Sequence, residues 1–66
     1  MEIQVNGERV EVATGSTVLE LLDRYDLSGR PCAVEVNAEL VPRRAHTTHA
    51  LGDGDVVEIV TLVGGG

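Results

Sequence analysis

The last β-forming run of the chain constrains its fold more than any other segment. Residues 56–63 form the longest run of β-formers, and apolar side chains fall on both sides of it. The two sides hold Val57, Ile59 and Thr61 on one and Val56, Val60 and Leu62 on the other. Apolar residues on both sides are typical of a central strand that is covered on two faces. The sequence therefore predicts a sheet built around this run.

The size of the chain predicts a single domain with a small core. It has 66 residues, and Cys32 is its only cysteine, so no disulfide can cross-link the fold. The sequence shows no charged-then-apolar leader, and no apolar run approaches the roughly 18 residues that span a membrane. We therefore expect a soluble protein of the cytoplasm.

Two alternating segments flank Asn6-Gly7, and this pattern predicts a β-hairpin with a tight turn. The hairpin would bury Ile3, Val5, Val10 and Val12. An amphipathic helix is predicted from about Thr17 to Tyr25, because Thr17 and Glu20 have capping-box spacing and apolar residues follow at helical intervals. Those apolar residues are Val18, Leu21, Leu22 and Tyr25.

A third strand is predicted at Cys32–Val36, with Ala33 or Val34 and Val36 in the core. Leu40-Val41 is at most a short edge strand, because the following proline removes a ladder donor. The other segments are predicted as a turn at 37–39, an irregular stretch or one helical turn at 43–51, and a turn cluster at 52–55.

The order β-β-α-β-β-β predicts an α+β fold of the β-grasp (ubiquitin-like) type. A mixed sheet of four to five strands would pack on one helix, and a right-handed crossover would return the third strand parallel to the first. The domain would span residues 1–63, with a flexible glycine tail at 64–66. One helix covers one face only, so either a partner covers the face with Val56, Val60 and Leu62, or loops around residues 43–49 shield it.

The net charge of the chain limits the classes of molecule that it is expected to bind. Eleven acidic residues against five basic ones give a net charge of −6, which disfavours nucleic acid and anionic membranes and favours a basic protein surface. All five cations are arginines, so no side-chain amine can accept an isopeptide bond. The chain can therefore donate an acyl group but cannot build chains of itself through lysine.

The sequence predicts that the protein is not an enzyme, because no Ser/His/Asp or Cys/His signature is visible. His46 and His49 are spaced like a metal-binding pair, but with no third ligand nearby we expect surface histidines and no metal site. Cys32 is expected to be a half-buried small hydrophobe rather than a sulfur relay. Solvated charge accounts for Glu8, Glu11, Asp53 and Asp55, and Arg43-Arg44 would contact a partner's acidic loop or solubilise the bend.

The chain ends in Gly64-Gly65-Gly66, which can thread a narrow channel because glycine has no side chain. Four extended residues reach about 13 Å, enough to enter a partner's active site. The carboxylate of Gly66 is a poor electrophile, so its use requires activation, most simply by ATP as an acyl-adenylate. An incoming sulfur would then give a thiocarboxylate, and an incoming amine a covalent tag; a frayed terminus is the plain alternative.

Taken over its full length, the chain resembles the ThiS family of ubiquitin-like sulfur carriers of thiamin biosynthesis. The resemblance rests on Asn6-Gly7, on residues 17–22, on 34–37 leading to 41–43, on 52–60 and on the diglycine end. It implies adenylation of Gly66 by a ThiF-like enzyme that uses ATP and magnesium, conversion to a thiocarboxylate, and sulfur delivery at thiazole synthase, ThiG. It also implies that Gly64 and Gly65 thread the partner's site and that Val56, Val60 and Leu62 face the partner, while the chain itself binds no cofactor.

Alternatives from other classes stay open at this point. A MoaD-like carrier for molybdopterin, or a carrier for cysteine, would use the same terminal chemistry. A ubiquitin-like modifier would join the same carboxylate to lysines of target proteins, and a plain binding module would not need the glycines. Gly64 is an extra glycine relative to the family pattern, which needs only the last two.

Overall fold

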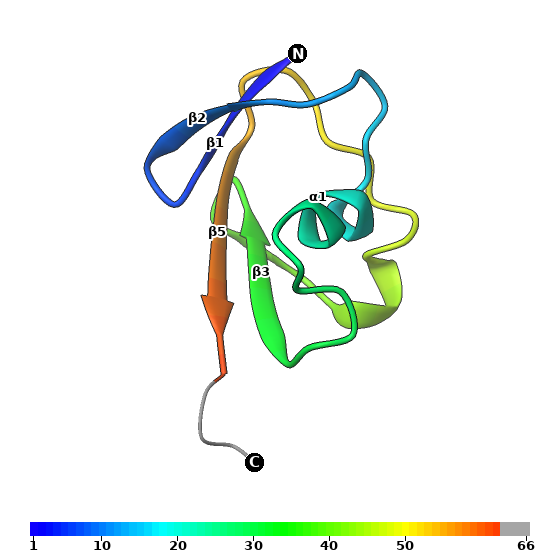
Figure 1. Ribbon diagram of the computed structural model, residues 1–66. Coiled ribbons are helices and arrows are strands. Elements are labelled where there is room, and N and C mark those ends of the chain that lie inside the picture. Colours follow the sequence, from blue (N-terminus) through cyan, green and yellow to red (C-terminus); the bar gives the residue numbers. More distant parts are fainter. Residues whose placement is uncertain (63–66) are drawn as a thin grey trace.

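The computed structural model describes residues 1–62, which form a five-stranded mixed sheet with the order β2-β1-β5-β3-β4. One α-helix, α1, lies across one face of this sheet (Figure 1). The elements are β1 (Glu2–Val5), β2 (Glu8–Glu11), α1 (Val18–Arg24), β3 (Cys32–Val36), β4 (Glu39–Val41), the 3-10 turn η1 (Arg43–Ala45) and β5 (Val56–Thr61). The predicted order of elements is confirmed, and the last strand is central, as its two-sided apolar pattern predicts.

The direction of the third strand differs from the prediction. Strand β5 pairs parallel with β1 and antiparallel with β3, so β3 runs antiparallel to β1. The prediction that the third strand returns parallel to the first is therefore wrong. The hairpin reverses the chain before the helix begins, so the crossover through α1 starts from β2, and β2 is the strand to which β3 is parallel.

Local signals place the hairpin turn and the helix as predicted. Asn6 and Gly7 both have positive φ, 48° and 86°, as a tight hairpin turn of this kind requires. The capping box is present: the Glu20 amide donates to Thr17 Oγ1 at 3.2 Å, and the Thr17 amide donates to Glu20 Oε1 at 2.9 Å. Tyr25, predicted on the apolar face, is instead the helix C-cap, and it is 40% exposed.

The core lies between α1 and the sheet. Val34 rather than Ala33 is the fully buried residue of β3, and the hairpin contributes Val10 and Val12 only as half-buried side chains. Leu51 comes from the irregular segment after η1 and fills one end of the core. The buried apolar residues are Ile3, Val5, Val18, Leu21, Leu22, Val34, Val36, Val41, Leu51, Val57 and Ile59.

Two asparagine side chains hold the backbone of β5 beyond its strand pairs. Asn6 Oδ1 accepts from the Ile59 amide at 2.7 Å, and Asn6 Nδ2 donates to the Ile59 carbonyl at 3.2 Å. At the start of the strand, Asn37 Oδ1 accepts from the Val56 amide at 2.9 Å, and its Nδ2 donates to Asp55 Oδ1 at 3.0 Å. These contacts continue the ladder where the flanking strands end, so the central strand is fixed along its length.

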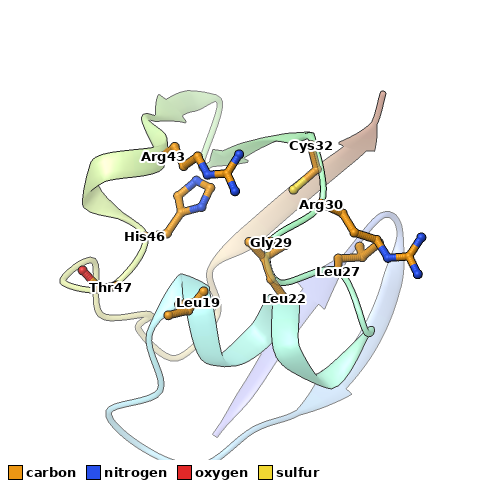
Figure 2. A pocket seen from close by; sticks show the side chains of 9 residues that line it. All are labelled: Leu19, Leu22, Leu27, Gly29, Arg30, Cys32, Arg43, His46 and Thr47. Carbon is orange, nitrogen blue, oxygen red and sulfur yellow. The ribbon is translucent and has the colours of Figure 1, made fainter. Parts of the chain in front are cut away.

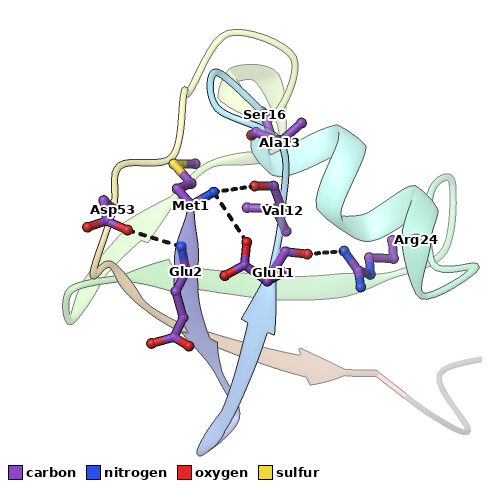
Figure 3. A network of polar contacts seen from close by, with 8 residues as sticks. All are labelled: Met1, Glu2, Glu11, Val12, Ala13, Ser16, Arg24 and Asp53. Carbon is purple, nitrogen blue, oxygen red and sulfur yellow. Dashed lines mark hydrogen bonds and ion pairs between the residues drawn. The ribbon is translucent and has the colours of Figure 1, made fainter.

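The N-terminal residue is tied to the end of the hairpin (Figure 3). The Met1 amine donates to the Val12 carbonyl at 2.8 Å and lies 3.5 Å from Glu11 Oε2. Asp53 Oδ1 accepts from the Glu2 amide at 3.0 Å, so this aspartate anchors β1 to the turn before β5. The prediction that solvated charge alone accounts for Asp53 is therefore wrong, because its partner lies 51 residues away in the sequence.

Candidate functional site

The face of the sheet opposite α1 exposes apolar side chains on its central strand. Along β5, Val57 is fully buried against the helix side, whereas Val56 and Val60 on the other side are 42% and 58% exposed. The alternative that residues 43–49 shield this face is wrong, because that segment bonds to the helix: the His49 and His46 carbonyls accept from the first amides of α1. Within residues 1–62 the open face is therefore available for a partner.

Leu62 directly follows Thr61, the last residue of β5. Strand β5 ends on the side of the molecule opposite the N-terminus (Figure 1). The Leu62 amide donates to the Pro31 carbonyl at 3.1 Å, and its side chain is 56% exposed. Together with Leu27, Arg30, Pro31 and Thr61 it lines a cavity of about 240 Å³. Strand β5 ends at Thr61, and the other predicted site residues, Gly64, Gly65 and Gly66, lie outside the described residues together with residue 63.

Strand register places two carboxylates on the open face. Glu58 of β5 lies directly opposite Glu35 of β3, and Glu35 lies directly opposite Leu40 of β4. All three side chains are exposed, Leu40 to 66%. Sequence reasoning missed these residues as members of the site. Each glutamate lies between two buried apolar residues of its strand, which could have assigned it to the open face, but only the register shows that the two glutamates are neighbours.

A smaller cavity of about 160 Å³ lies on the helix side (Figure 2). Cys32, Arg43 and His46 line it, and the half-buried Cys32 packs against the core as predicted. The prediction of a surface histidine is wrong for His46, which is only 6% exposed and whose Nε2 is 3.1 Å from the Val41 carbonyl oxygen. The fold turns this residue inward because the segment after η1 packs against α1, a contact that sequence spacing does not reveal.

The hydroxyl groups of Ser16 and Ser28 form hydrogen bonds within the fold. Ser16 Oγ donates to the Ala13 carbonyl at 2.6 Å, and Ser28 Oγ donates to Asp23 Oδ1 at 3.0 Å, so both hydroxyls stabilise turns. No group of three or more metal-ligating side chains gathers among residues 1–62. In the same part of the chain, no helix is long and apolar enough to cross a membrane.

Comparison with known proteins places the whole chain among sulfur carriers. The sequence model of the ThiS family matches residues 3–66. The sulfur carrier protein ThiS of Escherichia coli is 33% identical over 66 residues, which cover 100% of both chains. A crystal structure of the thiamine biosynthesis protein ThiS from Geobacter metallireducens superposes with a TM-score of 0.83 at 35% identity over 100% of both chains. The predicted β-grasp fold is thereby confirmed.

A larger relative is also similar to the entire chain. A thiazole synthase of Paramagnetospirillum magneticum is 39% identical over 66 residues, which make up 100% of this chain and 20% of that protein. The chain therefore spans about a fifth of the length of this relative, whose polypeptide combines a segment of this kind with a much longer sequence.

Proposed function

This chain belongs to the ThiS family, and from that premise we propose that it is a sulfur carrier of thiamin biosynthesis whose Gly66 bears the sulfur as a thiocarboxylate. The observation that carries the proposal is the match to E. coli ThiS, in which 66 aligned residues cover both chains completely. A match of this extent includes the glycine end as well as the folded body. The protein acts as a substrate of an activating enzyme and is not itself an enzyme.

The proposed chemistry takes place at one carboxylate. An oxygen of the Gly66 carboxylate attacks the α-phosphorus of ATP on a ThiF-like enzyme, pyrophosphate leaves, and magnesium neutralises the phosphate charge. Hydrosulfide from a sulfur donor then attacks the acyl carbon, the bond to the phosphate oxygen breaks and AMP leaves, which produces the thiocarboxylate. The nucleotide and the magnesium bind to the activating enzyme, so this chain needs no cofactor of its own. We place the reaction in the cytoplasm, where ATP is available.

The folded body brings the tail to the partner's active site. Val56 and Val60 on the open face, together with Leu62 at the end of β5, provide apolar surface for docking, and Gly64 and Gly65 then thread the partner's channel. Val56 and Val60 belong to β5, and Leu62 directly follows it. The strand that provides the docking surface therefore also leads to the glycine tail. The chain thus positions Gly66 by the way it docks.

Thiazole synthase is the second proposed partner, the one that receives the sulfur. The P. magneticum relative supports this assignment, because a chain named thiazole synthase contains a segment 39% identical to all 66 residues of this protein. Joining a carrier and its acceptor in one polypeptide raises their effective concentration and so favours sulfur transfer between them. When the two are separate chains, the carrier must dock on the acceptor for the same transfer.

Intact mass measurement tests the proposal. The purified chain, incubated with a ThiF-like enzyme, ATP, magnesium and a sulfur donor, should gain about 16 Da as one carboxylate oxygen is replaced by sulfur. Deletion of Gly66 is the control and should abolish the gain. A gain that survives the deletion, or no gain with an activating enzyme that charges another ThiS protein, would contradict the proposal. Stable conjugates to lysines of other proteins would instead identify a ubiquitin-like modifier.

A further inference from the structure

Two carboxylates of like charge face each other near the middle of the open face. Glu58 lies directly opposite Glu35 in the β5–β3 ladder, and both side chains are exposed. Directly opposed residues of an antiparallel pair have Cβ atoms about 4.5–5.5 Å apart, and like charges at such positions destabilise the sheet. The isolated chain therefore gains no stability from this pair. A role in binding would explain why two carboxylates lie opposite each other here.

No cation of the described chain compensates the pair. The one ion pair within residues 1–62 joins the Met1 amine to Glu11, on the far edge of the sheet. Arg9 belongs to the edge strand β2, which β1 separates from β5. The next residue in the row of the two glutamates is Leu40, which lies opposite Glu35. Within residues 1–62, neither glutamate takes part in an ion pair, so both carboxylates are free to bind a cation of another molecule.

Exposed apolar side chains surround the two glutamates. Leu40 lies beside Glu35, while Val56 and Val60 lie on either side of Glu58 along β5, and these three side chains are 66%, 42% and 58% exposed. The cores of protein interfaces are largely apolar and depleted of glutamate, aspartate and lysine, but arginine is enriched there and among the residues that contribute most to affinity. A guanidinium group is planar and presents several N–H donors, so it can bridge two carboxylates at this spacing.

We propose that Glu35 and Glu58 together bind one arginine side chain of the partner protein, with Leu40, Val56 and Val60 packing against apolar groups around it. The inference rests on the proposed function, because the partner is the enzyme that activates Gly66. The net charge of −6 supports the same occupant, since it attracts a basic surface and accelerates encounter at low salt. The bound arginine would also relieve the repulsion between the two carboxylates.

The test compares two double variants in the sulfur-loading assay. Glu35→Gln with Glu58→Gln removes the charge pair, and Glu8→Gln with Asp26→Asn removes two charges that lie outside the open face. We expect the KM of the activating enzyme for the first variant to rise at least about tenfold at low salt, with kcat little changed. The control variant should change KM by less than about twofold, because exposed remote charges contribute little. In the absence of the enzyme, the Glu35/Glu58 variant should have a melting temperature equal to or higher than that of the wild-type chain.

Three outcomes would overturn the inference while leaving the proposed function intact. The first is an equal KM for both double variants, and the second is a KM whose dependence on salt is the same in wild type and in the Glu35/Glu58 variant. The third is a lower melting temperature for that variant, since it would show that the pair does not repel. Failure of the wild-type chain to gain about 16 Da would instead contradict the proposed function itself.

Discussion

Substitution of Val60 by aspartate should separate partner binding from folding. Val60 is 58% exposed, so the isolated chain already leaves most of this side chain in water and should lose less than about 1 kcal/mol of stability. In the complex, burial of the remaining surface of a valine contributes about 1 kcal/mol, and an unpaired carboxylate in the same place costs about 1–3 kcal/mol more. The sum of about 2–4 kcal/mol corresponds to binding weakened by about 30- to 1,000-fold.

Isothermal titration calorimetry of the variant against a ThiF-like enzyme measures this loss directly, and thermal unfolding followed by circular dichroism checks the fold. Tyr25→Asp is the matched control, because Tyr25 is an exposed apolar residue, at 40%, at the end of α1 rather than on the open face. We expect the control to bind within about threefold of wild type, since substitutions outside an interface change affinity little.

The interpretation of the open face would be refuted by a Val60→Asp variant that folds normally and binds with wild-type affinity. Equal losses for Val60→Asp and Tyr25→Asp would refute it as well, because they would point to a general effect of added negative charge. Loss of binding together with loss of the folded signal would contradict the expected small effect on stability.

Three predictions concern stability. Thr17→Ala should lower the free energy of unfolding by about 1 kcal/mol through loss of the capping box, and the melting temperature by about 4–8 °C. Thr17→Ser keeps a hydroxyl group at the N-cap and should retain most of the wild-type stability. Asn6→Gly keeps the positive φ but removes both side-chain bonds to the Ile59 backbone, so urea unfolding should show a loss of about 1–3 kcal/mol and the Ile59 amide should exchange faster; unchanged exchange would refute this role. Glu11→Gln should cost less than about 1 kcal/mol, because this carboxylate is exposed and the Met1 amine keeps its bond to the Val12 carbonyl; a loss above about 2 kcal/mol would contradict this.

The parts of the fold that sequence predicts well are those specified by near neighbours. The Asn6-Gly7 turn depends on two residues that tolerate positive φ, and the start of α1 depends on Thr17 and Glu20 three positions apart. The central position of β5 also follows locally, because apolar residues fall on both sides of the run, a pattern typical of central strands.

The parts that sequence does not predict depend on contacts between distant segments. The direction of β3 follows from which strand feeds the crossover, and the burial of His46 follows from where the segment after η1 packs. The opposition of Glu35 and Glu58 is a property of register, which joins residues 23 positions apart and has no signature in either strand alone. The sequence thus indicates the apolar residues Val56 and Val60 of this surface. The structure adds the two glutamates that lie between them and Leu40.

Transfer of labelled sulfur tests the central claim, that Gly66 carries sulfur to a thiazole-forming acceptor, most directly. The chain is first loaded from a donor labelled with sulfur-34, which should raise its mass by about 18 Da, and is then purified and mixed with thiazole synthase and its small-molecule substrates. We predict that the chain returns to its starting mass and that the label appears in the small-molecule product. A loaded chain that keeps its added mass, or that loses it while no labelled product forms, would contradict the claim.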